Sequence, residues 1–106
     1  MQRNKVAPYE AVWPRGRRVA ASRQNSRRLS GLEGKTIGEL WDWLFRGDEI
    51  FPILERSLAE RFPGIRFVNY TSLGNTHGGD EKRVIAELPG KLREHGCDAV
   101  ISAVGC

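Results

Sequence analysis

The strongest constraint on the fold is the alternation of two hydrophobic patterns along residues 34–106. Three short runs of β-prone residues are typical of strands: residues 35–41, 65–70 and 98–104. Two longer segments repeat apolar side chains every three or four positions, which predicts amphipathic helices: residues 48–62 and 80–95. The resulting order of strand, helix, strand, helix, strand predicts an α/β fold with a parallel sheet and right-handed crossovers.

Both predicted helices carry start and stop signals. Asp48 and Asp80 are predicted N-caps, and each is followed by a Glu that suits the positive end of the helix dipole. A Pro-Gly pair ends the first helix, and Gly96 ends the second. Residues 71–79, between the second strand and the second helix, are rich in Gly and are predicted to form a loop.

The third strand is nearly all apolar, a pattern that fits a strand covered on both faces. Three parallel strands and two helices make about half of a doubly wound domain. We therefore predict an incomplete α/β domain at residues 31–106, with a partial Rossmann-like, three-layer architecture. A third helix is expected after Cys106 to cover the sheet. Without it an edge strand and one face of the sheet are exposed, so self-association through the incomplete sheet is expected.

Residues 1–30 are predicted to form a basic arm and linker. They hold eight of the seventeen Lys and Arg residues but one of the thirteen Asp and Glu residues, so the net charge of +4 comes from this arm. Residues 9–13 and 17–20 flank a Pro-Arg-Gly turn and predict a hairpin packed by Trp13. The arm would suit salt-dependent contacts to nucleic-acid phosphates, but the chain has no recognition helix or zinc pattern. Nucleic-acid binding therefore ranks behind a solvated tail.

The composition disfavours several classes of protein and site. No apolar run approaches the ~20 residues that span a bilayer, and the first residues lack the apolar core of a secretory signal. Cys97 and Cys106 lie at opposite ends of the third strand, too far apart at about 3.3 Å per residue to form a disulfide with each other. Reduced thiols predict a cytoplasmic protein. The two His residues form no metal-ligand cluster, and neither a GxGxxG nor a P-loop motif occurs, so no metal and no cofactor is predicted.

Candidate site residues follow from the rule that open α/β sheets bind ligands at the carboxyl ends of their strands. The candidates for contact with a polar substrate lie in the loops after the first two strands: Asp42, Arg46, Asn75, Thr76 and His77. For Asp42 and Arg46 the alternative is a local ion pair. His77 could be a general base, a metal ligand or neither. The Asp-Glu pairs that open both helices would repel a phosphate, which disfavours a nucleotide site.

Cys106 is the candidate for reactive chemistry. It would stand at the start of the expected third helix, where the helix dipole favours a thiolate. The alternative is a small buried residue at the end of a strand. Cys97, at the other end of the same strand, is predicted to be structural.

Three segments resemble bacterial proteins of the UGSC type: GKTIGELWDWLFRGDEIFP (residues 34–52), NYTSLGNTHGGDE (69–81) and GCDAVISAVGC (96–106). A weaker likeness lies in the VWPRG of the arm. The resemblance implies a selenocysteine- or cysteine-Gly-Ser-Cys motif just after a strand like the third one, and that motif does not occur among the 106 residues. Selenocysteine is encoded by UGA, which is ordinarily a stop codon. The resemblance therefore implies truncation at a selenocysteine codon after Cys106, before a segment that begins Sec-Gly-Ser-Cys.

Three functions follow from these observations. The resemblance favours the N-terminal part of a thiol or selenol redox protein, an oxidoreductase when full length and inactive as it stands. Its substrate would be an unidentified small molecule or thiol, and Cys106 would be an auxiliary thiol at most. The first alternative is a Rossmann-like domain that binds a small metabolite or catalyses a reaction without redox chemistry. The second alternative is a nucleic-acid-binding module that uses the basic arm.

Overall fold

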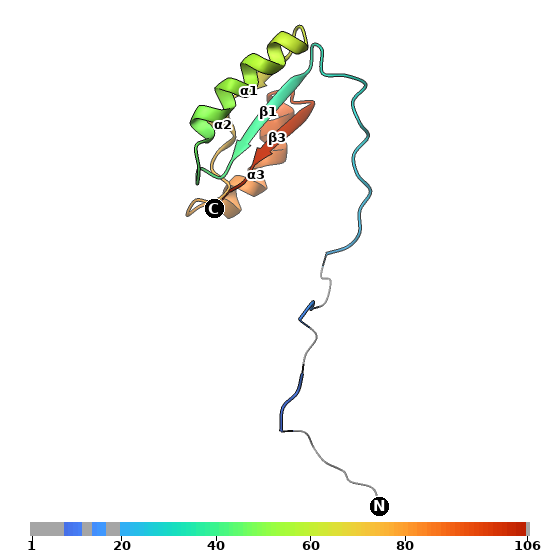
Figure 1. Cartoon of the computed structure of the whole chain (residues 1–106), viewed down its shortest axis with the longest axis vertical. Coiled ribbons are helices and arrows are strands. Elements are labelled where there is room, and N and C mark those ends of the chain that lie inside the picture. The colour runs from blue at the N-terminus through green and yellow to red at the C-terminus, as the bar shows by residue number, and fades with distance from the viewer. Residues whose placement is uncertain (1–7, 12–13, 17–19, 106) are drawn as a thin grey trace, which may run out of the picture.

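The computed structural model describes residues 8–11, 14–16 and 20–105. The elements follow one another in this order: β1 (Thr36–Trp41), α1 (Gly47–Arg61), β2 (Arg66–Val68), α2 (Tyr70–Leu73), α3 (Glu81–Glu94) and β3 (Ala99–Ala103) (Figure 1). The predicted alternation of strands and helices is therefore confirmed, with one short helix added between β2 and α3.

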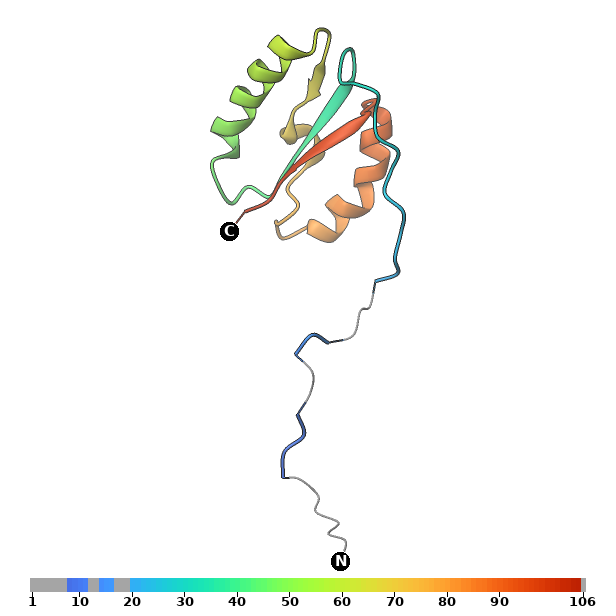
Figure 2. The same cartoon turned by 45° about the vertical axis from the view of Figure 1, so that its right-hand side comes forward.

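The strands form one parallel sheet in the order β2-β1-β3. Thr36 of β1 lies opposite Arg66 of β2. On the other side of β1, Ile37 lies opposite Ala99 and Trp41 opposite Ala103. Figure 2 shows β1 between its two partners, with the carboxyl ends of β1 and β3 at the same edge. The central position of β1 explains why it is the most buried strand: all of its residues are buried except Leu40, which is partly buried.

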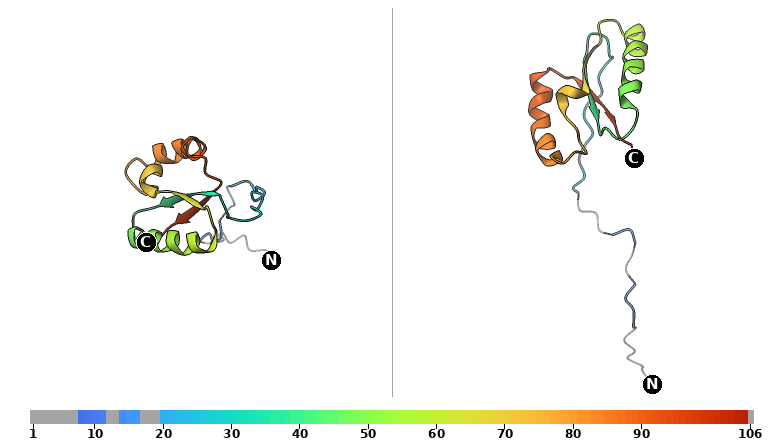
Figure 3. Two further views of the ribbon diagram at one scale, coloured as in Figure 1. Left: turned by 90° about the horizontal axis from the view of Figure 1, so that it is seen from above. Right: turned by 90° about the vertical axis from the view of Figure 1, so that its left-hand side faces the viewer.

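Helices cover both faces of the sheet. Figure 3 shows the sheet between α1 on one face and α3 on the other, with α2 on the side of α3. This arrangement of helices on both faces of a parallel sheet confirms the predicted α/β class.

Alternate residues of β1 supply both layers of the core. Trp41 packs under the start of α1, where a Cβ added to Gly47 would lie 2.5 Å from the indole. Gly38 faces the opposite layer, where a Cβ would lie 3.2 Å from the sulfur of Cys97 and 3.3 Å from Leu92. The absence of a side chain at Gly38 therefore lets α3 approach the sheet. The most buried apolar side chains are Phe51 of α1 and Leu73 of α2, and burial of residues of this size stabilises the fold by about 1.5–3 kcal/mol each.

The predicted N-cap of the first helix is wrong. Helix α1 begins at Gly47, its N-cap position is Arg46, and no side chain in the described part of the chain caps it. Asp48 and Glu49 instead lie in the first turn, where their charges suit the helix dipole. Gly47 is the first residue of the helix, and Trp41 leaves no room for a side chain at this position.

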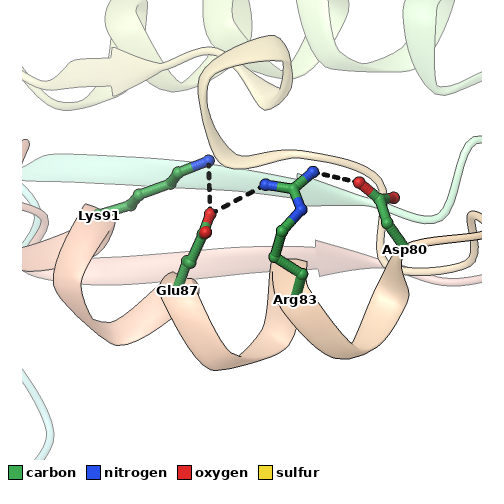
Figure 4. A network of polar contacts seen from close by, with 4 residues as sticks. All are labelled: Asp80, Arg83, Glu87 and Lys91. Carbon is green, nitrogen blue, oxygen red and sulfur yellow. Dashed lines mark hydrogen bonds and ion pairs between the residues drawn. The ribbon is translucent and has the colours of Figure 1, made fainter.

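Asp80 is the N-cap of α3, as predicted, but its carboxylate accepts no hydrogen bond from the backbone N–H groups of the first turn of the helix. It pairs instead with Arg83, whose guanidinium also bonds Glu87 at 3.2 Å. Lys91 lies 3.8 Å from the same Glu87 carboxylate, so the four side chains form one row along the helix (Figure 4). The Arg83 guanidinium holds the pKa of Asp80 below its usual value. These groups are exposed, so the row adds to helix stability only modestly.

The segment predicted as a loop contains the short helix α2. The side chain of Asn69 caps it by accepting a hydrogen bond from the N–H of Thr71 at 3.0 Å. Leu73 at its end is completely buried, and the isolated apolar residue gave no periodic signal in the sequence.

The expectation that the third strand is covered on both faces is wrong for the described chain. Val100 is 39% exposed, and Val104, just after β3, is 77% exposed. The physical reason is the strand order: β3 lies at an edge of the sheet, whereas the buried strand β1 lies at its centre.

The described residues of the basic arm form neither helix nor strand. The predicted hairpin includes Trp13 and residues 17–19, which lie outside the described residues. Among the helices that are described, none has the length and hydropathy needed to cross a membrane.

Candidate functional site

The carboxyl ends of the strands bring the predicted site loops together. Trp41, the last residue of β1, forms a parallel bridge with Asn75 in the loop after α2. The next residue, Asp42, donates its backbone N–H to the carbonyl oxygen of Ala103 at 3.3 Å. The loop after β1 therefore lies between the loop that precedes α3 and the segment that follows β3.

The carboxylate of Asp42 joins two of these segments. Asp42 is 5% exposed. Its Oδ1 accepts a hydrogen bond from the N–H of Leu44 at 3.1 Å, and its Oδ2 accepts one from the N–H of Gly105 at 2.8 Å. Both oxygens thus bind backbone N–H groups of the protein. The sequence suggested a substrate contact for this residue, whereas the structure gives it partners within the chain.

Gly105 is enclosed from a second side by an aromatic ring. A Cβ added to Gly105 would lie 2.8 Å from Cδ1 of Phe45, closer than any side chain could be accommodated without movement of the ring. The following residue, Cys106, lies outside the described residues.

The loop before α3 is organised by one of its own candidates. The side-chain oxygen of Asn75 accepts the backbone N–H of His77 at 2.8 Å, which closes a local turn. Asn75 and Thr76 are partly buried, whereas His77 is exposed. The bridge to Trp41 places this loop at the sheet edge, as predicted, and its contact with a substrate stays a prediction.

Arg46 forms a local ion pair, but its partner is Glu49 and not Asp42, so the pairing that the sequence offered as an alternative is not observed. Its guanidinium lies 3.5 Å from the carboxylate of Glu49, and both side chains are largely exposed. Such a pair contributes about 0–1 kcal/mol to stability. The same exposure leaves Arg46 accessible from solvent near the loop of Asp42.

An aromatic cluster supports the loop after β1. Trp41 stacks on Trp43 with ring centroids 4.8 Å apart, and Tyr70 packs its ring edge-on against both. Trp43 has a φ of 65°, a left-handed conformation that is costly for a bulky residue, and it remains 44% exposed. The stacking on Trp41 helps to hold this conformation. The loop is therefore well packed, and this packing holds its residues Asp42 and Phe45 in place.

Glu39 is a buried carboxyl group that the sequence analysis missed. It is 1% exposed, and neither of its oxygens has a hydrogen-bond partner among the described residues. Burial raises the pKa of Glu39 to about 8, the neighbouring carboxyl of Glu55 acts in the same direction, and the backbone of Tyr70 acts in the opposite one. The signal that could have found it is the alternation of Ile37, Glu39 and Trp41 on one face of β1.

The model of the UGSC family matches residues 10–106. The chain belongs to the UGSC family. No curated protein and no solved structure matched it. The match confirms the resemblance based on the three segments and extends it through most of the basic arm, so the arm from Glu10 onward is part of the family's sequence and not an unrelated extension.

Within this UGSC chain, the two cysteines have different settings. Cys97 is free, partly buried and close to Gly38 in the layer of α3. Burial raises the pKa of its thiol, with the charge of Asp98 acting in the same direction, so Cys97 is a poor nucleophile. This agrees with its predicted structural role. In the described part of the chain, no group of three or more His, Cys, Asp or Glu residues could hold a metal ion.

Proposed function

We propose that this UGSC chain forms the sheet edge of a thiol- or selenol-dependent redox protein whose reactive motif follows Cys106. The observation that carries the proposal is the family match, which extends to the last Gly-Cys pair of the chain. The hydrogen bond from Gly105 to Asp42 supports it, because it brings the end of β3 to the edge where α/β sheets bind ligands.

The proposed chemistry is thiol–disulfide exchange at a Sec-Gly-Ser-Cys or Cys-Gly-Ser-Cys motif. The selenolate or thiolate of the first residue attacks one sulfur of a substrate disulfide and releases the other sulfur as a thiolate. The second cysteine of the motif then attacks the mixed bond, releases the second substrate thiolate and leaves an internal bond within the motif. Two electrons pass to the substrate, and a dithiol reductant restores the motif.

The motif itself does not occur among the 106 residues. We propose that an in-frame UGA codon follows the Cys106 codon and is read as selenocysteine. Sequencing of the gene tests this directly. A UGA followed by codons for Gly-Ser-Cys supports it, and any other continuation contradicts it.

The substrate-binding role proposed for the rim residues rests on their position and exposure. His77 and Arg46 are exposed, and Asn75 is held beside Trp41 by a strand bridge. A polar small molecule or a thiol substrate would meet these groups at the edge of the sheet. A cytoplasmic location is proposed with this chemistry, because reduced thiols persist there.

The function is tested by comparing three proteins in a thiol–disulfide exchange assay with a dithiol reductant and an aliphatic disulfide. We expect the 106-residue chain to be inactive and the product extended through Cys-Gly-Ser-Cys to be active. Replacement of the last motif cysteine by Ser in the extended product should stop turnover after one mixed disulfide. Equal activity of the short and extended proteins would contradict the redox function and leave the small-metabolite alternative.

A further inference from the structure

We propose that Asp42 is a positioning residue for the reactive motif: it holds the backbone N–H of Gly105, two residues before the proposed motif, and so sets how the chain leaves the sheet. The inference rests on the proposed function in one respect, namely that the reactive motif begins directly after Cys106. It assigns Asp42 a role within the protein in place of contact with a substrate.

The bonds of Asp42 tie together two segments that are 63 residues apart in the sequence. Its N–H bonds the carbonyl of Ala103, and its carboxylate bonds the N–H of Gly105 at 2.8 Å. Residues on both sides of Val104 are thus held by one residue of the neighbouring loop. Val104 itself is 77% exposed, so packing of its own side chain does little to hold this segment.

The ring of Phe45 restricts Gly105 sterically. It lies so close to Gly105 that a Cβ there would approach Cδ1 to 2.8 Å, and the ring is itself packed edge-on against Trp41 at 6.0 Å between centroids. Gly105 is therefore held by a carboxylate and by a ring, and both come from the loop that follows β1. Because consecutive Cα atoms lie about 3.8 Å apart, fixing Gly105 keeps the first residue of the proposed motif, two positions further on, within about 7.6 Å of Gly105.

The charge of Asp42 matters as well as its shape. An ionised carboxylate accepts both N–H groups, whereas an amide side chain has one acceptor oxygen and would turn its NH₂ group towards the other N–H. Asp42→Asn therefore keeps the size of the side chain and removes one of the two bonds. Hydrogen bonds to a charged acceptor are the stronger class, so the loss should be measurable at a single amide.

The test uses the 106-residue chain with Asp42→Asn, and Asp48→Asn as the matched control. Asp48 is an exposed carboxylate at the same end of the sheet, in the first turn of α1. Amide hydrogen exchange of Gly105 is followed by NMR, and alkylation of Cys106 and Cys97 by iodoacetamide is followed by mass spectrometry. Cys97 lies at the other end of β3 and reports general opening of the domain.

We expect exchange at the Gly105 amide to accelerate about ten-fold or more in Asp42→Asn and its proton resonance to move upfield, since the bond to a charged acceptor is lost. The ratio of Cys106 to Cys97 alkylation rates should change at least three-fold, with neither effect in Asp48→Asn. If both cysteines change by the same factor, Asp42 only stabilises the fold and the inference is overturned.

If Asp42→Asn fails to fold, a second pair of variants tests the same inference. Gly105→Ala should displace Phe45 and change the same alkylation ratio, and adding Phe45→Ala should restore it by making room for the new methyl group. Absence of any change in Gly105→Ala would overturn the inference. These readouts need no redox activity, so an extended protein that is inactive while the alkylation ratio depends on Asp42 would contradict the proposed function alone.

Discussion

The buried carboxyl of Glu39 predicts that the domain loses stability as the pH rises from about 4.5 to about 8. The substitution Glu39→Gln tests this prediction, because it removes the titrating carboxyl group and keeps the size of the side chain. The pKa of Glu39 is about 8 in the folded protein and 4.5 in its ordinary state. Between these values the folded protein holds a proton that the unfolded chain has released, so each rise in pH favours unfolding.

The magnitude follows from the size of the pKa shift. One pKa unit corresponds to about 1.36 kcal/mol, so the rise to about 8 corresponds to at most about 5 kcal/mol of unfolding free energy. Stability from this group is complete below pH 4.5, falls across the interval and is lost above pH 8. A domain of this size has little stability to spare, so the effect is large enough to decide whether it is folded at alkaline pH.

The assay is urea unfolding of the wild-type chain and Glu39→Gln at several pH values from 4.5 to 8.5. We expect the unfolding free energy of the wild type to fall relative to that of Glu39→Gln by several kcal/mol across this range. Glu60→Gln is the control, because Glu60 is exposed and lies on the same helix as Glu55. Its unfolding free energy should change with pH in the same way as that of the wild type. Parallel curves for the wild type and Glu39→Gln would refute the argument, because they would mean that Glu39 ionises as easily as an exposed carboxyl.

Three further predictions concern packing and association. Gly38→Val should destabilise the domain by about 1–3 kcal/mol in urea unfolding, because its side chain would enter the space of Cys97 and Leu92; an unchanged midpoint would contradict this. Gly90→Ala, with open space around its Cβ within α3, should stabilise the domain by about 0.5–1 kcal/mol in the same assay, and a loss of stability would show that the position is constrained. We propose that the open edge of β3 supports self-association, so light scattering of the 106-residue chain should show a concentration-dependent mass that Val104→Lys lowers; a constant monomer mass for the wild type would exclude it.

The strands and helices were predictable from local pattern, with exceptions that have physical causes. The apolar spacing from Ile50 to Phe62 predicted α1, but not its start at Gly47, where the tertiary contact with Trp41 excludes a side chain. The helix α2 escaped prediction because four residues cannot show a period, and its one buried anchor is Leu73.

The position of the candidate site in the fold was predictable from the sequence, but the roles of its residues were predictable only in part. The carboxyl edge of a parallel sheet follows from strand order along the chain, and Asp42 and Asn75 do lie there. The partners of Asp42 were not predictable, because a carboxylate after a strand suits a substrate, an ion pair and backbone N–H groups equally well. The role of Phe45 required knowing that its ring meets Gly105.

The sequence by itself determined the alternation of strands and helices, the basic arm and membership of the UGSC family, because these depend on composition, periodicity and ordered segments along the chain. The tertiary structure alone decided which strand lies at the centre, and with it the burial of Glu39 and the bond between Asp42 and Gly105. The physical reason is that strand order is set by how helices pack across the sheet. Residues far apart along the chain therefore become neighbours only when the whole domain is assembled.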